Sequence, residues 1–566
     1  MRAVPILCCA VAACGGGGAQ SDAGKSDAAG VIDVLPPTDV PADADTTVPG
    51  FSTWPRDKIL YHAYVRSFFD SDGDGHGDLP GLTQKLDYIQ ALGVDGILLL
   101  PIFADTYIES GGYGTTDYGH VTAAYGGDAA FAAFVTAAHA KGLKVILDLS
   151  FTLVADQHPW FAAAMTSAAA PERAHFEVTS GPPCPTLTDQ VGGNGWHAFA
   201  DSQCFFSDYA AQFPSLNQRD EATAEAMRVA AEHWLAAGVD GFRLDSASSI
   251  AQVDPANPTA AKDPSSPATH AFWLPFMQRI KRANPDVFAV AELFDHEADY
   301  YADGIDMTFQ YQIYFGLVDG WTKSIKSTLS FTLAAQLAAR PTGSFGGIFT
   351  GNHDVPGGFV APGGRLADVA CPLPCTDHTP LVTAAMLLFS LPGTPFVYYG
   401  EELGMRGAAD VDTSQTLPWS RNPMQWDATS ARGFTTGTPW TPVSTDSANV
   451  AAQVNVAGSM LETYKGLIGT RKGSPALEHG GYREVPTDRP DVFAFVREDP
   501  AERVLVVASF GHAATATNLD LASLGITSAI ATERIFGSAL PAVTAANAGA
   551  YGIALPAQGA IWILLK

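Results

Sequence analysis

Four carboxylates in this chain each stand at or just after the end of a short apolar segment. They are Asp148, Asp245, Glu292 and Asp354. One carboxylate can attack the anomeric carbon of a sugar while a second gives and takes the proton of the leaving group, so acids that converge in space are the equipment of a glycosidase. The pattern therefore suggests a site that cleaves sugars, provided that the fold brings these acids together.

The segments before the acids are short, apolar and bounded by turn residues, which is typical of buried parallel strands. They cover 144–147, 237–242, 287–290 and 347–350, and helical spacing of apolar residues marks 128–141 and 221–237. Alternation of strands and helices over this length predicts an α/β fold, a (β/α)₈ TIM barrel. The C-terminal ends of barrel strands share one mouth, where carboxylates from separate strands can reach one substrate.

Length and charge set further limits. The chain has 566 residues, more than one core usually holds, so a barrel with at least one smaller domain is expected. Its formal net charge of −27 argues against nucleic acid partners, because a surface poor in Lys and Arg gains nothing from releasing counterions. A neutral substrate is easier to accommodate.

The N-terminus has the pattern of an export signal. Arg2 precedes an apolar run over 3–13, and 11–14 has the form of a bacterial lipobox. We predict a lipoprotein signal peptide over 1–13, lipidation of Cys14 and a flexible tether over 14–50, which is rich in Gly, Ala, Asp and Pro. The alternative is an ordinary signal peptide that contains cysteines. The prediction places the protein outside the cytoplasm, lipid-anchored at the bacterial cell envelope, at the outer membrane or cell surface.

Removal of the signal and lipidation of Cys14 leave four cysteines: Cys184, Cys204, Cys371 and Cys375. An even number in an exported protein favours two disulfides, and we prefer pairing between sequence neighbours among the three possible connectivities. A zinc site is the competing interpretation, although the spacing is irregular for one.

The loop 70–78 alternates carboxylates with glycines. Oxygen ligands for one hard cation are available from Asp70, Asp72, Asp74, Asp78 and the backbone carbonyl of His76. The loop resembles the first part of an EF-hand but lacks its distal glutamate, since Gly81 stands there. We predict a structural calcium ion and no organic cofactor; the alternative is a solvated acidic turn.

From about Phe51 to the C-terminus, the chain resembles the α-amylase family of glycoside hydrolases, particularly bacterial lipoprotein α-amylases and oligosaccharide-active α-glucosidases. The matching segments follow the family's order. They are 64–68, 93–97, 101–103, 112–113, 116–118, Asp148 with 156–161, 241–245, Glu292, 352–354, 393–395, 400–402 and 421–426.

The resemblance implies a retaining mechanism through a covalent glycosyl-enzyme. Asp245 matches the nucleophile and Arg243, two residues earlier on the same strand face, the cation that keeps it ionised. Glu292 matches the general acid/base, which must carry a proton near neutral pH, and its neighbours in sequence are suitably apolar. Asp354 matches a third carboxylate that bonds sugar hydroxyls. The implied substrate-binding residues are Tyr113, Asp148, Arg243 and His353. Taken singly, each of these residues also fits a structural ion pair, strand end or turn.

Some positions depart from the family pattern. Thr152-Leu153 replaces an Asn-His pair, of which the His contacts the sugar, and Ser215 replaces an Asp. Loss of the Asn and the Asp predicts that the calcium site between the barrel and its inserted domain is absent. Ser248-Ser249 replaces a Lys-His pair of the leaving-group subsite. We predict an active enzyme with altered specificity or modest efficiency, since one lost sugar contact costs on the order of 1–3 kcal/mol of binding.

The expected domains are a barrel over 51–155 and 213–472, a loop-rich domain B inserted over 156–212 after the third strand, and a C-terminal antiparallel β-sandwich over 473–566. The predicted function is hydrolysis of α-glucosidic bonds, α-1,4 in the first place, in starch-derived maltooligosaccharides. Two alternatives stay open: an α-glucan transglycosylase or trehalose-forming isomerase, and a catalytically silent glucan-binding lipoprotein.

Overall fold

The computed structural model describes residues 47–566 except 109–110, 182, 355–364, 372–376, 408–418, 445 and 534–539. The predicted signal peptide, Cys14 and nearly all of the predicted tether therefore lie outside the described residues. Cys375 lies outside them as well.

Eight parallel strands close into a barrel in the order β1-β13-β12-β11-β10-β9-β5-β2. In chain order these strands are β1 (Leu60–Ala63), β2 (Gly96–Leu99), β5 (Lys144–Leu149), β9 (Gly241–Leu244), β10 (Phe288–Ala291), β11 (Met307–Phe309), β12 (Phe345–Phe349) and β13 (Thr394–Tyr398). The predicted TIM barrel is confirmed. Each of the four apolar segments singled out in the sequence overlaps one of its strands.

Side chains along each strand point alternately to the inside and the outside of the barrel, and both sides are apolar. In β5, Ile146 belongs to the same apolar cluster as Leu98 of β2 and Leu60 of β1, whereas Val145 and Leu147 belong to a larger core that includes the surrounding helices. Both faces of the parallel sheet are therefore buried, as this architecture requires. Asp148 lies two residues after Ile146, so its side chain belongs to the inner face, at the C-terminal end of the strand.

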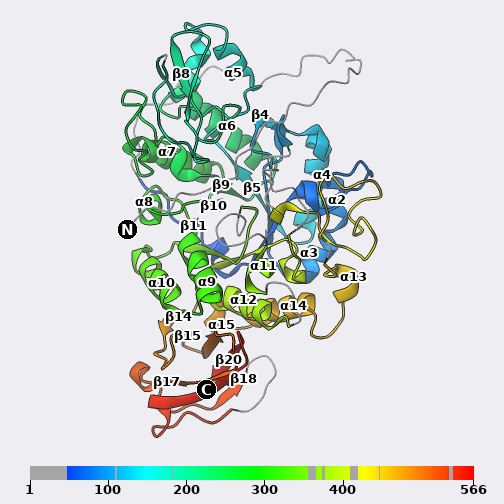
Figure 1. The fold of residues 1–566 in the computed structure, drawn as a ribbon, viewed down its shortest axis with the longest axis vertical. Coiled ribbons are helices and arrows are strands. Elements are labelled where there is room, and N and C mark those ends of the chain that lie inside the picture. The colour runs from blue at the N-terminus through cyan, green and yellow to red at the C-terminus, as the bar shows by residue number, and fades with distance from the viewer. Residues whose placement is uncertain are drawn as a thin grey trace.

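Helices connect the strands and cover the barrel (Figure 1). They are α1 (Val65–Phe68), α2 (Leu79–Gln84), α3 (Leu86–Leu92), α4 (Gly127–Ala140), α6 (Glu221–Ala236), α7 (Pro267–Ala283), α8 (Glu297–Tyr301), α9 (Tyr311–Lys323), α10 (Ser327–Ala339), α11 (Leu366–Ala370), α12 (Thr379–Ser390), α13 (Val450–Gln453), α14 (Met460–Lys472) and α15 (Pro475–His479). The side chain of Asp220 accepts the backbone N–H of Thr223 and so caps the start of α6, which lies where its apolar spacing predicted it.

Loops after β2 and β5 build the upper part of the molecule in Figure 1. After β2, the strands β3 (Phe103–Asp105) and β4 (Thr115–Val121) pair antiparallel. After β5 come α5 (Pro159–Ala164) and a small antiparallel sheet, β6 (Val178–Ser180), β8 (Gln203–Phe206) and β7 (Trp196–Ala198). The two ends of this inserted segment lie side by side, because the backbone N–H of Asp156 donates to the carbonyl of Gln212 at 2.9 Å.

Antiparallel strands form the C-terminal part, at the opposite end of the molecule (Figure 1). One sheet has the order β14-β15-β16-β20-β18, and β17 pairs with β19. Their bounds are β14 (Gly481–Glu484), β15 (Val492–Asp499), β16 (Glu502–Ser509), β17 (Thr515–Leu519), β18 (Ala531–Glu533), β19 (Tyr551–Leu555) and β20 (Ala560–Leu565). Phe493, Phe495 and Trp562 pack into the barrel core, so this part is attached by apolar contacts. No helix among the described residues is long and apolar enough to span a membrane.

Candidate active site

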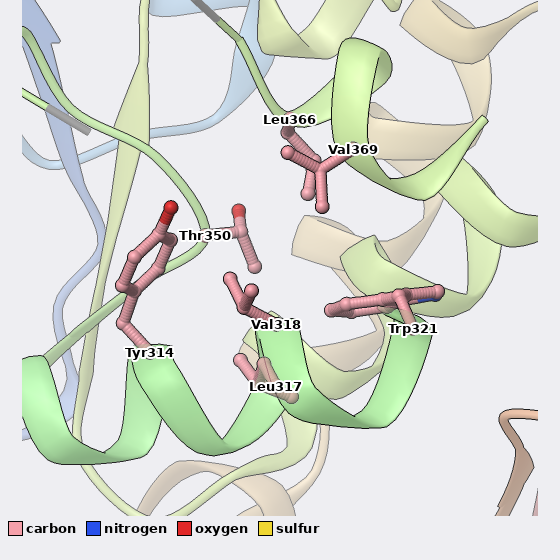
Figure 2. Close-up of a pocket in the computed structure, with 7 residues that line it drawn as sticks. All are labelled: Tyr314, Leu317, Val318, Trp321, Thr350, Leu366 and Val369. Carbon is pink, nitrogen blue, oxygen red and sulfur yellow. The ribbon is translucent and has the colours of Figure 1, made fainter. Parts of the chain in front are cut away.

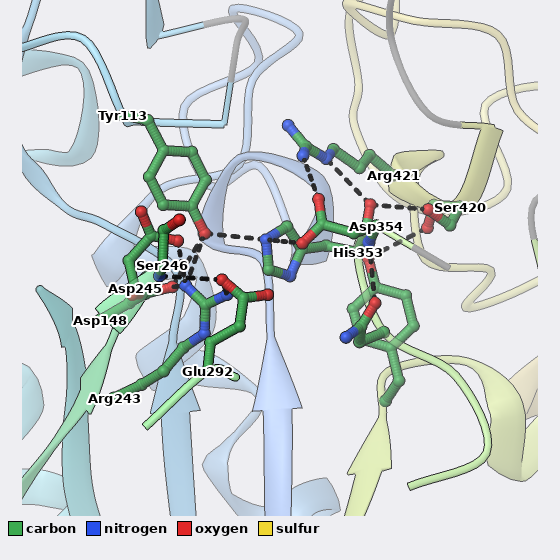
Figure 3. Close-up of polar contacts among 12 residues, drawn as sticks. Tyr113, Asp148, Arg243, Asp245, Ser246, Glu292, His353, Asp354, Ser420 and Arg421 are labelled. Carbon is green, nitrogen blue, oxygen red and sulfur yellow. Dashed lines mark hydrogen bonds and ion pairs between the residues drawn. The ribbon is translucent and has the colours of Figure 1, made fainter. Parts of the chain in front are cut away.

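The predicted site residues meet at the C-terminal ends of neighbouring strands. Asp148 of β5 and Arg243 of β9 are register partners in the parallel ladder. Asp245 comes directly after β9, and Glu292 directly after β10. His353 and Asp354 follow β12 from across the mouth (Figure 3). The short apolar strands thus aim their terminal polar residues at one point, which is the geometry that the sequence predicted.

Arg243 joins the acids. Its Nη1 lies 2.6 Å from Asp148 Oδ2 and 2.8 Å from Asp245 Oδ1, and its Nη2 lies 2.8 Å from Glu292 Oε2 (Figure 3). The guanidinium is almost completely buried. One buried cation therefore holds carboxylates from three strands close to one another through charge-assisted hydrogen bonds.

Burial controls the ionisation of this cluster. It raises the pKa of Asp148 to about 6, against the opposing charge of Arg243. Burial also raises the pKa of Asp245 well above its usual value; Arg243 opposes the rise, and Glu292 and Asp148 add to it. Burial alone would lower the pKa of Arg243, but the surrounding carboxylates raise it well above its usual value. One cation among three buried acids favours a proton shared within the group, which suits acid/base chemistry.

Glu292 is held on both of its oxygens. Oε2 accepts the backbone N–H of Ser246 at 3.0 Å in addition to its ion pair with Arg243. Ser246 has a left-handed backbone (φ 43°), and this conformation directs its N–H toward the glutamate of the next strand. Oε1 accepts the hydroxyl of Tyr311 at 2.7 Å.

Tyr113 and His353 connect the acids of β5 and β9 to Asp354. The Tyr113 hydroxyl lies 2.9 Å from Asp148 Oδ2 and 2.8 Å from His353 Nε2, and its ring stacks on the imidazole with centroids 5.8 Å apart (Figure 3). Burial lowers the pKa of His353 well below its usual value, so the imidazole is neutral. Its Nε2 lies 3.0 Å from Asp354 Oδ2, and Arg421 lies 3.1 Å from Asp354 Oδ1.

All seven residues predicted for catalysis and substrate binding therefore belong to one contiguous network, although their roles stay predictions. Sequence reasoning missed Tyr311 and the backbone of Ser246, and gave Arg421 no role although it lies in a segment of the resemblance. Arg421 is buried beside Asp354, which no apolar strand pattern indicates. Tyr311 follows β11, a strand of three residues that no acid follows directly, so the pattern of an apolar strand followed by a carboxylate does not indicate it.

The positions that depart from the family pattern lie close to the network. Thr152 and Ser215 meet where the inserted segment joins the barrel: the Leu216 N–H donates to the Thr152 carbonyl at 2.9 Å, and Leu153 bridges Ser215. The Leu153 side chain is buried. Ser249 accepts the hydroxyl of Ser246 at 3.0 Å, next to the nucleophile position. Hydroxyl side chains thus occupy most of these positions, and Leu153 is the apolar exception.

Within the predicted cation loop, Asp70, Asp72 and Asp78 can each offer a carboxylate oxygen, with these atoms within 4.8 Å of one another. Asp74 is not part of this group: its carboxylate accepts the His76 N–H at 2.7 Å. Asp78 also caps α2 by accepting the Gly81 N–H at 2.6 Å. The oxygen donors of the three converging aspartates fit a hard cation.

Of the predicted disulfides, the structure contains Cys184–Cys204, with Cα atoms 5.8 Å apart. It ties the loop between β6 and β7 to β8. The second predicted pair includes Cys375, which is not among the described residues, so that pairing stays a prediction.

A small apolar cavity lies beyond the site, between α9 and α11 (Figure 2). It has a volume of about 10 Å³ and is lined by Tyr314, Leu317, Val318, Trp321, Thr350, Leu366 and Val369. This is room for no more than one water molecule, so the cavity does not bind a sugar.

Comparison with known proteins agrees with this geometry. Residues 62–480 match the alpha amylase catalytic domain, and residues 482–562 match the maltogenic amylase C-terminal domain. The chain belongs to the α-amylase family of glycoside hydrolases. This family assignment covers the barrel, its inserted segment and the first C-terminal helices, and it makes the chain an enzyme of the glycosidase class.

Relatives in the α-amylase family differ in their named activities. The chain is 30% identical over 495 residues to a trehalose synthase/amylase of Mycolicibacterium smegmatis, covering 80% of this chain and 82% of the relative. It is 28% identical over 525 residues to an oligo-1,6-glucosidase of Halalkalibacterium halodurans, covering 81% and 90%. The trehalulose synthase of Pseudomonas mesoacidophila shares the fold, with a TM-score of 0.78 at 24% identity over 91% of this chain and 99% of that one.

Proposed function

We propose that this family member is a retaining hydrolase of α-glucosidic bonds, chiefly α-1,4 bonds in maltooligosaccharides. The observation that carries the proposal is the single guanidinium of Arg243 bridging Asp245 and Glu292. A nucleophile and an acid/base that share one cation are held close together, as retention at the anomeric centre requires (carboxyls about 5 Å apart).

In the proposed reaction, Asp245 attacks the anomeric carbon while Glu292 gives its proton to the departing glycosidic oxygen. Water then attacks the glycosyl-aspartate, Glu292 takes a proton from it, and the sugar leaves with its anomeric configuration retained. Asp354, fixed by Arg421, accepts hydrogen bonds from sugar hydroxyls, and Tyr113 provides an aromatic face for the ring.

The second candidate function is transfer of the glucosyl group to another sugar instead of to water, because one relative is named a trehalose synthase/amylase. The proposed chemistry at Asp245 and Glu292 is the same in both reactions. The choice depends on the leaving-group side, where Tyr209 of the inserted segment lies 3.2 Å from the Ser246 hydroxyl and Ser249 completes the hydroxyl cluster.

A panel of glucosides separates these functions. We expect purified protein to release glucose or shorter oligosaccharides from maltose and maltotriose, with isomaltose, sucrose and trehalose as competing substrates. Product analysis at low and high sugar concentration distinguishes the reactions, since trehalose or longer products that persist at low concentration would support transfer. Binding of maltotriose without any product from the panel would support a catalytically silent glucan-binding protein.

We also propose that the 70–78 loop binds calcium in a structural role, held by Asp70, Asp72 and Asp78. A ligand bound only by the folded state at a hundredfold excess over its Kd stabilises by about 2.7 kcal/mol. Chelation should therefore lower the melting temperature of the wild type and added calcium should restore it. Asp72→Ala should abolish this response, whereas Asp87→Ala, on the exposed face of α3, should keep it. An unchanged calcium response in Asp72→Ala would contradict the assignment.

A further inference from the structure

We propose that Tyr311 is a positioning residue for the acid/base: its hydroxyl holds the Glu292 carboxyl in an orientation that leaves Oε1 to carry the transferable proton. The inference rests on the proposed function for the role of Glu292. It concerns a side chain that the strand pattern of the sequence did not indicate.

Tyr311 is anchored so that its hydroxyl cannot turn away. It is the first residue of α9, and its buried ring packs on Phe294 and Phe349 with centroids 4.3 and 4.9 Å away. Its Oη lies 2.7 Å from Glu292 Oε1 and 2.9 Å from Asn352 Nδ2. The tyrosine therefore connects the acid of β10 with the loop after β12.

The directions of these hydrogen bonds follow from one backbone group. The Asp354 N–H donates to Asn352 Oδ1 at 2.9 Å, which fixes the amide so that its NH₂ group faces Tyr311. An amide nitrogen only donates, so the Tyr311 oxygen accepts from Asn352. The hydroxyl hydrogen of Tyr311 is then directed to Glu292 Oε1.

The two oxygens of Glu292 consequently differ. Oε2 receives two donors, the Arg243 guanidinium and the Ser246 N–H, which use both of its acceptor positions. Among the described residues, Oε1 accepts a hydrogen bond from Tyr311 alone, which leaves one of its acceptor positions open. The proton that goes to the leaving group, and that returns from water in the second step, is therefore bound at Oε1.

Hydrogen bonds to the charged form of a carboxyl group favour that form, so a variant that lacks the Tyr311 hydroxyl is expected to stabilise the Glu292 carboxylate less. The other charged or titratable groups that bear on the pair from surrounding elements are Asp148 on β5, Arg243 and Asp245 on or after β9, and Asp354 after β12. Replacement of Tyr311 by phenylalanine keeps the ring and all of these charges, and removes one donor.

The experiment compares Tyr311→Phe with Tyr314→Phe. Tyr314 is buried one turn along the same helix, and its hydroxyl has no hydrogen-bond partner among the described residues (Figure 2). For Tyr311→Phe, we expect the alkaline limb of the kcat/KM profile on maltose to move up by about one pH unit, since a hydrogen bond to a charged group is lost. We expect kcat/KM on maltose to fall about tenfold, and on α-glucosyl fluoride to change much less, because fluoride needs little protonation to leave. Tyr314→Phe should match the wild type.

Several results would overturn the inference: an unmoved alkaline limb, an equal loss on maltose and glucosyl fluoride, or the same shift in Tyr314→Phe. A direct measurement distinguishes a failure of this inference from a failure of the proposed function. The Glu292 carboxyl can be followed by ¹³C NMR on labelled protein, with its resonance identified by absence in Glu292→Gln. If the wild type cleaved no glucoside, the proposed function would fail. A Glu292 titration that moves to higher pH in Tyr311→Phe would still support the contact between Tyr311 and Glu292. An unmoved titration would refute it.

Discussion

Asp245→Asn is expected to reduce the release of sugar from maltose by at least about 10⁴-fold, because an amide cannot form the glycosyl ester. Its oxygen can still accept from Arg243, so the fold and the neighbouring acids should stay in place. Initial rates on maltose and maltotriose, measured with the melting temperature of each protein, test this result.

The matched control is Asp240→Asn, at the opposite end of the same strand. Asp240 pairs with Lys144 and His139 near the N-terminal end of β9, away from the mouth of the barrel. Its replacement should leave the rates close to those of the wild type. Activity retained by Asp245→Asn, or lost equally by both variants, would contradict the assignment of Asp245 as the nucleophile.

Glu292→Gln is expected to lower turnover of maltose by about 10²–10⁴-fold, since the glutamine can neither give nor take the proton. Azide attacks without a general base, so it should restore turnover of α-glucosyl fluoride in this variant and produce α-glucosyl azide. Mass spectrometry and NMR of the product give both its identity and its anomeric configuration.

Glu297→Gln, on α8, serves as its control. Glu297 is also buried, and it accepts a hydrogen bond from Gln336 that a glutamine oxygen can accept as well. The control should hydrolyse maltose normally and show no response to azide. A β-configured azide product, or rescue of the control alone, would show that Glu292 does not act as the acid/base of a retaining enzyme.

The strands that carry the proposed acids could be predicted, because in each of them an apolar segment ends at or near a carboxylate. β5, β9, β10 and β12 are apolar, short and followed by a carboxylate, so the same residues that build the barrel also mark its mouth. The register of Asp148 with Arg243 follows from that alternation. These parts of the site could be derived from the sequence because each depends on contacts along or between neighbouring strands.

Tyr311 and Arg421 could not be derived in this way. The strand before Tyr311 has only three residues, and a tyrosine after it is as compatible with core packing as with a polar contact. Arg421 reaches Asp354 across 67 residues of sequence, part of which lies outside the described residues. Contacts of this kind depend on the closed shape of the barrel, which no local pattern contains.

The hydrogen bond between Asp156 and Gln212 joins the two ends of the inserted segment, and this affects how the segment can vary in evolution. Since the two ends already lie side by side, a longer or shorter insertion changes the entropy of closing the loop only slowly with length. Tyr209 brings that insertion to the Ser246 hydroxyl beside the proposed nucleophile. Changes in this segment are therefore an expected route to a new substrate preference, because they can alter the contact at Ser246 without changing the strands that carry the acids.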